Sequence, residues 1–269
     1  MSNSIITLLS DLGTRDTTVT VVKAILKRYA PQSAIVDISH NVAQYDLQQA
    51  AYLLLSAYKY FSQGSVHVLL VDVFAGDAPR MLVAEKDGNY FIAPDNGILP
   101  LAFGTSLENT RLCFEFSKPY SFNEWINDAG KVIEALQQGS IVGFVPCDIE
   151  KAPRILQPRI LPDGVECNIL YIDRYENVVL DITKEQFEVM IKGRPFKIQI
   201  MRTEEITSVS NNYNDVEQDE PLCRFNSAGF LEIAFNHAPA ASSLGLGSFS
   251  TGNLRYQTIK ILFQRGAGE

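Results

Sequence analysis

IITLLSDLGTRD (residues 5–16) decides the fold of the N-terminal half. Its apolar first part, residues 5–9, predicts a buried β-strand. Apolar residues then recur at helical spacing until Pro31, which predicts a helix. Asp11 and Asp16 therefore lie in a turn between the carboxyl end of a strand and a helix, which is where open α/β sheets bind their ligands.

The side chains of this turn indicate which ligands it would accept. Asp11 and Asp16 supply carboxylates, and Thr14, Thr17 and Thr18 supply hydroxyls, where a phosphate-binding loop would have glycines and a lysine. We therefore expect a ribose diol or a cationic ligand. Asp16 alone is explained equally well as a helix cap that accepts backbone N–H bonds, whereas Asp11 lies outside any capping position.

The composition is that of an ordinary globular protein. With 269 residues, 46% of them hydrophobic and 20% charged, the chain can form one large or two medium domains. A net charge of −8 argues against partners such as nucleic acid or an anionic membrane. The longest apolar runs are too short to span a membrane.

Cysteine and histidine usage predicts a reduced protein without a metal site. The four cysteines are scattered and form no C-x-x-C pair, which is typical of thiols in the cytoplasm. The three histidines, His40, His67 and His237, have no metal-ligand spacing. His40, at a predicted strand end, is more simply explained as a hydrogen-bonded structural residue than as an acid or base.

The pattern over residues 1–147 predicts an α/β domain whose mostly parallel sheet has helices on both faces. Its further predicted elements are strands at residues 33–38 and 66–73, a helix from Asp46 to Phe61, a hairpin of residues 81–84 and 90–93 around a turn at 86–88, a helix at 128–138 and a strand at 141–145.

The sequence pattern changes after residue 147. Residues 148–162 contain three prolines and no periodicity, which predicts a linker. Short strand-like runs separated by turn residues then predict a smaller all-β domain, a barrel or a sandwich, over residues 163–269. The small residues of the stretch 238–252 predict a loop. The strand-like runs of this β domain are residues 165–173, 177–182, 196–201, 222–226, 229–235 and 258–263.

Six segments in order along the chain resemble one family, the S-adenosylmethionine hydrolases (adenosine-forming), which are related to the fluorinating and chlorinating enzymes that use the same substrate. They are SDLGTRD (10–16), VDISHNVAQYDLQQAAYLL (36–54), APDNGIL (93–99), IDRYENV (172–178), NYNDVEQDEPL (212–222) and NSAGFLEIAFN (226–236). The resemblance implies attack of a water-derived nucleophile on the ribose C5′, which releases adenosine and methionine without a cofactor. It also implies a homotrimer whose substrate lies between one subunit's N-terminal domain and its neighbour's C-terminal domain.

The resemblance also assigns substrate-binding roles. Asp11 falls where the ribose hydroxyls are bound, and Asp16, Thr18 and Asp173 fall where the amino-acid end is bound. Tyr45 corresponds to a position beside the ribose. The remaining implied residues belong to the C-terminal part of the pocket: Tyr213, which matches an aromatic residue that stacks on adenine, and Asn177, Ser227 and His237 near it.

Simpler structural explanations exist for several of these residues. Tyr45 and Tyr213 can be ordinary half-buried aromatics. Asn177 is more simply explained by a turn, and Asp46 by a helix cap.

The chain departs from the family around the attacking water. Asp72 of the first water-binding segment is retained, but the family arginine position falls on Pro79, with Arg80 one residue later. In the second segment, Asn123 replaces histidine and Trp125 replaces arginine. An asparagine cannot exchange protons near neutral pH, although it can orient a water molecule.

Three hypotheses follow for the catalytic groups. Asp72 with Arg80 can suffice for slow hydrolysis, or Asp77 or Glu124 can take over the missing role. In the third hypothesis, the chain binds S-adenosylmethionine or adenosine without turnover. A trimer with a purely structural role is the least favoured hypothesis, because Asp11 and Asp16 are in place.

Overall fold

The computed structural model describes residues 4–74, 79–104, 107–115, 120–140, 144–149, 157–200, 205–246 and 257–264. The chain forms two compact units, residues 1–155 and residues 156–269. The hydrophobic clusters of the first unit are distinct from that of the second. Each unit therefore buries its own apolar side chains.

The first unit alternates strands and helices along most of its length. Its elements are β1 (Ile6–Ser10), α1 (Thr18–Tyr29), β2 (Ile35–Ser39), α2 (Leu47–Ala57), the 3-10 turn η1 (Tyr58–Tyr60), β3 (Val66–Leu70), β4 (Arg80–Lys86), β5 (Asn89–Pro94), α3 (Ile98–Phe103), β6 (Glu108–Glu115), α4 (Phe122–Gln137) and β7 (Val145–Pro146).

These strands form one seven-stranded sheet in the order β2-β1-β3-β5-β4-β6-β7. The strands β2, β1, β3 and β5 pair in parallel, whereas β4, β6 and β7 are added by antiparallel pairing. The α/β class is confirmed, but the sheet is mixed rather than mostly parallel, because the predicted hairpin joins β4 to β5 and β6 then pairs with β4. The parallel strands bring their carboxyl ends to one edge of the sheet.

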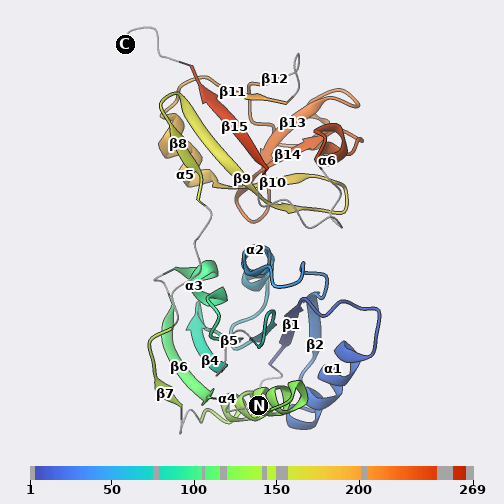
Figure 1. Ribbon diagram of the computed structural model, residues 1–269, viewed down its shortest axis with the longest axis vertical. Helices are drawn as coiled ribbons and strands as arrows, with labels where there is room; N and C mark the ends of the chain where they lie inside the picture. Colours follow the sequence, from blue (N-terminus) through green and yellow to red (C-terminus); the bar gives the residue numbers. More distant parts are fainter. Residues whose placement is uncertain are drawn as a thin grey trace. The chain divides into compact units, whose positions relative to one another are not determined.

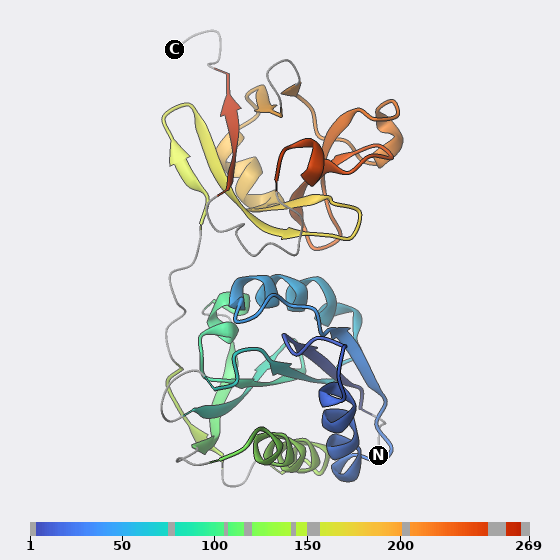
Figure 2. The same ribbon diagram turned by 45° about the vertical axis from the view of Figure 1, so that its right-hand side comes forward.

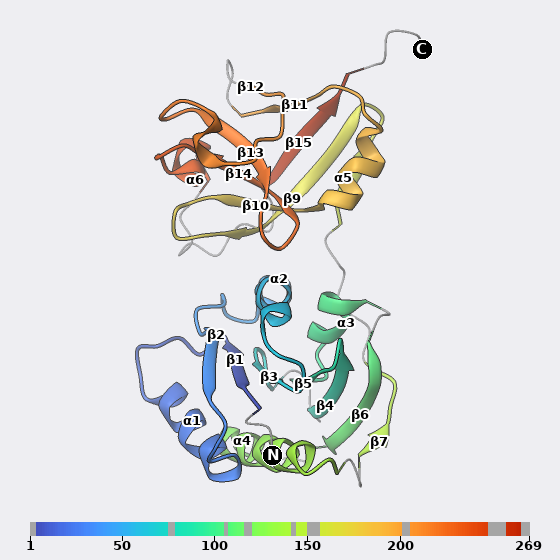
Figure 3. The same ribbon diagram turned by 180° about the vertical axis from the view of Figure 1, so that it is seen from behind.

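Helices cover both faces of this sheet, as predicted. Helices α1 and α4 cover one face, and α2 and α3 cover the other (Figures 1 and 3). Leu26 of α1 and the fully buried Trp125 of α4 belong to the first cluster. Leu54 of α2 and Leu99 of α3 belong to the second. The apolar stripes of all four helices thus face the sheet.

Strand β6 was not predicted, and three helical features of the first unit differ from the prediction. Helix α4 begins at Phe122 rather than at residue 128, because Ser121 and Glu124 form a capping box ahead of it. Helix α3 was not predicted; Gly97, at φ +94°, turns the chain into it. The helix expected to reach Phe61 ends at Ala57 and continues as the 3-10 turn η1.

The second unit is mostly β-structure. Its elements are β8 (Arg159–Leu161), β9 (Gly164–Ile172), β10 (Val178–Thr183), α5 (Lys184–Ile191), β11 (Phe196–Gln199), β12 (Glu205–Ile206), the 3-10 turn η2 (Tyr213–Asp215), β13 (Pro221–Phe225), β14 (Phe230–Phe235), α6 (Ala240–Ser243) and β15 (Thr258–Phe263).

The strands of the second unit form an eight-stranded antiparallel sheet in the order β12-β11-β15-β9-β10-β14-β13, with β8 paired to β9. A bridge between Val209 and Cys223 brings the segment after β12 beside β13, so the sheet nearly closes. Figure 2 shows the strands curving round in this way. The structure therefore selects the barrel-like alternative of the sequence analysis.

Local differences also occur in the second unit. Part of the stretch predicted as a linker, residues 159–161, is strand β8. Helix α5 was not predicted; Thr183 and Gln186 form a capping box at its start. Residues 240–243 of the predicted loop form helix α6. Residues 141–143 of one predicted strand and residues 247–252 of that loop lie outside the described part of the chain.

Helices long and apolar enough to span a membrane are absent from the described residues.

Candidate functional site

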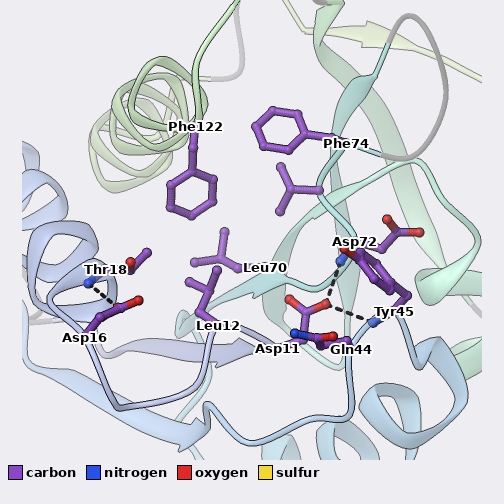
Figure 4. Close-up of a pocket in the computed structure, with 11 residues that line it drawn as sticks. Asp11, Leu12, Asp16, Thr18, Gln44, Tyr45, Leu70, Asp72, Phe74 and Phe122 are labelled. Atoms are coloured by element: carbon purple, nitrogen blue, oxygen red, sulfur yellow. Dashed lines mark hydrogen bonds between the residues drawn. The ribbon is translucent and has the colours of Figure 1, made fainter.

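A cavity of about 550 Å³ lies at the carboxyl ends of β1 and β3, the edge that the sequence predicts for a ligand. Figure 4 shows Asp16 and Thr18 on one side of it, Asp11, Tyr45 and Asp72 on the other, and Leu12 and Leu70 between them. The cavity is lined by Asp11, Leu12, Asp16, Thr18, Gln44, Tyr45, Leu70, Asp72, Val73, Phe74 and Phe122. Five of the twelve predicted site residues thus face one cavity.

The loop after β1 is tied to the loop after β2. The Gly13 N–H donates to the His40 carbonyl at 2.7 Å, and the Tyr45 N–H donates to Asp11 Oδ2 at 3.0 Å. Tyr45 has φ +61°, a left-handed conformation that bulky residues rarely adopt. The Asp11 carboxylate therefore helps to hold Tyr45 in this conformation, and each loop fixes the other.

His40 has the structural role that the sequence analysis favoured. It is buried, with Nδ1 at 2.7 Å from the Ser10 hydroxyl and Nε2 at 3.1 Å from Asp37 Oδ1. These contacts place its carbonyl under the loop at Gly13. His40 itself does not line the cavity, so it supports the site without contacting a ligand there.

Asp11 and Asp72 bring two carboxylates to the same side of the cavity. The Asp72 N–H points at Asp11 Oδ2 across 3.4 Å, so the two residues are linked through backbone and side chain. Burial, and secondarily the negative charge of Asp11, raise the pKa of Asp72. A carboxylate with a raised pKa in a cavity is suited to accept a proton.

Asp16 lies in a different electrostatic environment. Its Oδ1 accepts the Thr18 N–H at 2.8 Å, and this hydrogen bond lowers the pKa of Asp16. The side chain is exposed at the start of α1. It therefore stays charged over a wide pH range, as the binding of an ammonium group requires. Asp16 also accepts a backbone N–H at the start of α1, as the cap explanation expected, although the N-cap residue itself is Thr17.

The wall of the cavity is apolar, and most of that wall was missed from sequence. Leu12 and Leu70 form its centre, and Phe74 and Phe122 face it from the loop after β3 and the start of α4 (Figure 4). Phe74 and Phe122 fall inside the two segments that were compared with the family's water-binding motifs. This position is the sequence signal that could have identified them as lining residues. Gln44, the remaining polar lining residue, precedes Tyr45.

Arg80 and Asn123 do not line this cavity. Arg80 Nη1 is 3.0 Å from Asp95 Oδ2, and its Nη2 donates to the Asp148 carbonyl at 3.3 Å. Asn123 is exposed on the first turn of α4. The alternative Glu124 is engaged in the capping box, and Asp77 lies outside the described residues.

In the second unit, Asp173 and Asn177 form one turn. Asp173 Oδ1 accepts the N–H groups of Tyr175 and Asn177 at 2.8 and 2.9 Å, and its Oδ2 accepts the Asn177 side-chain amide at 2.9 Å. Asn177 is buried and Tyr175 is exposed. The turn explanation of Asn177 is therefore sufficient for its local structure, and Asp173 shares it.

Tyr213 is held by two charged residues. Its hydroxyl donates to Glu232 Oε1 at 2.8 Å, and the Arg224 guanidinium lies over its ring at 4.6 Å from the centroid. Burial and the neighbouring Glu232 raise the pKa of Tyr213 to about 12. Tyr213 is 39% exposed, so part of its ring is free to contact another group.

Ser227 and His237 are exposed at opposite ends of the β13–β14 hairpin. Ser227 lies in the turn between the strands, and His237, at φ +59°, follows β14. The second unit therefore does not gather its five predicted residues into one local cluster.

Within the described residues, no group of three or more His, Cys, Asp or Glu side chains could hold a metal ion.

Comparison with known proteins identifies the family. The N-terminal and C-terminal domain models of the SAM hydroxide adenosyltransferases match residues 6–127 and residues 167–251. An (R)-S-adenosyl-L-methionine hydrolase of Thermus thermophilus is 30% identical over 253 residues, which are 88% of this chain and 94% of that protein. This chain belongs to the SAM hydroxide adenosyltransferase family.

Other members of the family group agree with this assignment. An (R)-S-adenosyl-L-methionine hydrolase of Methanocaldococcus jannaschii is 30% identical over 86% of this chain and 88% of its own. A fluorinase of an Actinoplanes species is 23% identical over 89% of this chain and 93% of its own. The fold matches the crystal structure of an uncharacterized conserved protein of Thermotoga maritima with a TM-score of 0.79 at 25% identity, covering 96% of this chain and 99% of that one.

Proposed function

We propose that this chain hydrolyses S-adenosylmethionine to adenosine and methionine. One observation carries the proposal: Asp11 and Asp72, from two parallel strands, meet in a cavity of about 550 Å³ in a member of this enzyme family. The relatives named (R)-S-adenosyl-L-methionine hydrolase match along most of the chain and support it.

The proposed reaction is a displacement at the ribose C5′. The oxygen of water forms a bond to C5′ while the bond from C5′ to sulfur breaks, and sulfur takes the electron pair to become the neutral thioether of methionine. Asp72 accepts the proton of the water. Because a sulfonium is already a good leaving group, the enzyme mainly aligns the nucleophile and removes its hydration, and Leu12, Leu70 and Phe122 provide an apolar wall for this purpose. The chemistry needs no cofactor.

The binding roles follow the electrostatics of the cavity. Asp11 accepts hydrogen bonds from the ribose hydroxyls, since one carboxylate can take both. Asp16 and Thr18, on the opposite side in Figure 4, bind the amino-acid end through its ammonium group. Tyr45, 65% exposed beside Asp11, packs against the ribose. The two sides together suit a substrate that carries both a sugar and an amino acid.

The predicted site residues of the second unit enter the proposal through the assembly of subunits. We assign Asp173, Asn177, Tyr213, Ser227 and His237 to the adenine and amino-acid side of a site shared between subunits of a homotrimer. Light scattering at micromolar concentration tests this assembly, with a mass three times that of the chain expected. A monomer that retains full affinity would contradict the shared site.

Arg80 and Asn123 remain in the proposal as secondary catalytic residues. Neither lines the cavity in the first unit, so each contributes less than Asp72. The substitution Asn123→His restores the residue of the family motif and is expected to raise the rate by only a few-fold, far less than the roughly 10²- to 10⁴-fold contribution of a proton-transfer group in contact with substrate, because position 123 does not line the cavity. An unchanged rate would remove Asn123 from the catalytic set.

The deciding experiment is product analysis after incubation with S-adenosylmethionine in ¹⁸O-labelled water. We expect adenosine labelled at its 5′-oxygen, and methionine in equal amount. Asp72→Asn, which keeps the size of the side chain, is the matched control and should yield little of either. Binding of the substrate without any product would favour the alternative of a binding protein, which the pairing of Arg80 with Asp95 also favours.

The cytoplasm is the proposed compartment. The described structure contains four free cysteines, two of them, Cys167 and Cys223, fully buried. Free thiols are typical of a reducing environment. Fractionation of the native host, with the chain in the fraction of soluble cytoplasmic proteins, checks this assignment.

A further inference from the structure

Asn96 connects three backbone groups beneath the catalytic side of the cavity. Its side-chain Nδ2 donates to the Val71 carbonyl at 2.9 Å and to the Asp72 carbonyl at 3.1 Å. Its Oδ1 accepts the Ile98 N–H at 3.2 Å. Asn96 is 8% exposed, so these bonds are shielded from water. A single carboxamide thus joins the segment after β3 to the start of α3.

The two carbonyls that Asn96 binds need a partner that the sheet does not supply. The pairing of β3 with β1 ends at Leu70, and its pairing with β5 ends at Val68. The Val71 and Asp72 carbonyls therefore lie beyond both ladders, and a buried carbonyl without a partner is costly. The Asn96 amide meets this need with its two N–H bonds.

The same bonds act where the backbone is strained. Asp72 has φ +47°, a left-handed conformation that a non-glycine residue adopts only when its surroundings hold it there. Asn96 holds the carbonyl side of Asp72, and Asp11 faces its N–H side at 3.4 Å. The backbone of Asp72 is thus held on both sides, which fixes the direction in which its side chain leaves the backbone.

We propose that Asn96 is a positioning residue for the hydrolysis, which holds the strained backbone of Asp72 so that its carboxylate faces the attacking water. This inference rests on the proposed function. Asn96 itself does not line the cavity, so it acts through Asp72. The titratable groups that share the cavity with Asp72 are Asp11 from the loop after β1, Asp16 before α1, and Tyr45 before α2.

The chain offers a matched control in Asn89. It begins the strand β5 that Asn96 follows, is 3% exposed, and accepts the Ser65 N–H at 3.2 Å through its Oδ1, at the other end of the strand. Asn89→Ala therefore removes a buried backbone contact of the same sheet without touching Asp72. Both alanine variants are expected to lower the melting temperature.

The test compares Asn96→Ala with Asn89→Ala in the full chain, by kcat, KM and a carbon NMR titration of the Asp72 carboxyl group. We expect Asn96→Ala to lower kcat by roughly 10- to 100-fold with KM within about threefold, as for a misplaced catalytic group. The Asp72 titration should move to lower pH, because a released carboxylate reaches water. Asn89→Ala should leave kcat within about twofold and the titration unchanged.

Two further outcomes are separable. If Asn96→Ala does not fold, Asn96→Ser replaces it, because its shorter side chain still offers an acceptor to the Ile98 N–H but cannot donate to both the Val71 and the Asp72 carbonyl. The same loss of kcat is expected. If the wild type releases no adenosine, the proposed function fails, and the Asp72 titration alone decides on Asn96. The inference would be overturned if the Asn96 variants kept the same fraction of the wild-type kcat as Asn89→Ala and the titration of Asp72 did not move.

Discussion

The two sides of the cavity hold carboxylates in opposite electrostatic states. On one side, Asp72 has a raised pKa because it is partly buried and faces Asp11. On the other, Asp16 is exposed and has a lowered pKa because it accepts the Thr18 N–H. The same residue type can therefore serve as a proton acceptor on one side and as a permanent anion on the other.

The difference comes from how each side is built. Asp72 follows a buried strand and is reached by groups from distant segments, Asp11 and Asn96. Asp16 depends on a contact two residues away in the sequence. The position of Asp72 therefore depends on distant segments, whereas the contact of Asp16 depends on its own turn.

The largest expected effect is on the rate, at the buried side. Asp72→Asn should lower kcat by about 10²- to 10⁴-fold, the usual contribution of a general base, and should leave the affinity for S-adenosylmethionine nearly unchanged. Steady-state kinetics and calorimetry on the same preparation check this. A variant with the wild-type rate would show that proton transfer to Asp72 is not part of the reaction.

The next effect is on affinity, at the same side. Asp11→Ala should weaken the binding of both S-adenosylmethionine and adenosine by roughly 30- to 150-fold, because the ribose diol loses an acceptor for two hydrogen bonds. It should also release the Tyr45 N–H, so a variant structure or an NMR spectrum is needed as a control for the loop. Equal affinity of variant and wild type would exclude Asp11 from the ribose site.

The pH dependence of the rate should separate the two sides. Because the pKa of Asp72 is raised, the active carboxylate is lost when the pH falls through a value above the ordinary 3.9 of aspartic acid, and kcat then falls about tenfold per pH unit. Asp16, with its lowered pKa, stays ionised over that range, so its contribution to KM should stay constant. A parallel change of kcat and KM would mean that the two carboxylates titrate together.

The smallest effect is expected at the exposed side. Asp16→Ala should weaken the binding of S-adenosylmethionine by roughly 2- to 5-fold, the range for an exposed ion pair. It should leave the binding of adenosine unchanged. Thr14→Val, which changes an exposed side chain of the same turn outside the cavity lining without removing the charge, is the control. The measurement compares this variant with Asp11→Ala. Loss of adenosine binding in both variants would contradict the assignment of Asp11 to the ribose and of Asp16 to the amino-acid end.

The sequence by itself determined the local parts of this protein. The apolar run before Asp11 and the helical spacing after it predicted β1 and α1, and the turn between them was predicted to face a ligand. Asp46 was predicted as a cap and accepts the N–H groups of Gln48 and Gln49. These features depend on spacing and on hydrogen bonds within a few residues, so a single segment contains all the information they need.

Only the tertiary structure decided what the site contains. Asn96 lies 24 residues after Asp72 in the sequence and binds its carbonyl, a contact that no spacing rule predicts. The register of β1 against β3 places Asp72 beside Asp11, 61 residues away. The same packing draws Arg80 towards Asp95 instead of into the cavity. Contacts between distant segments depend on how buried faces fit together, and that fit is fixed only when the whole unit has folded.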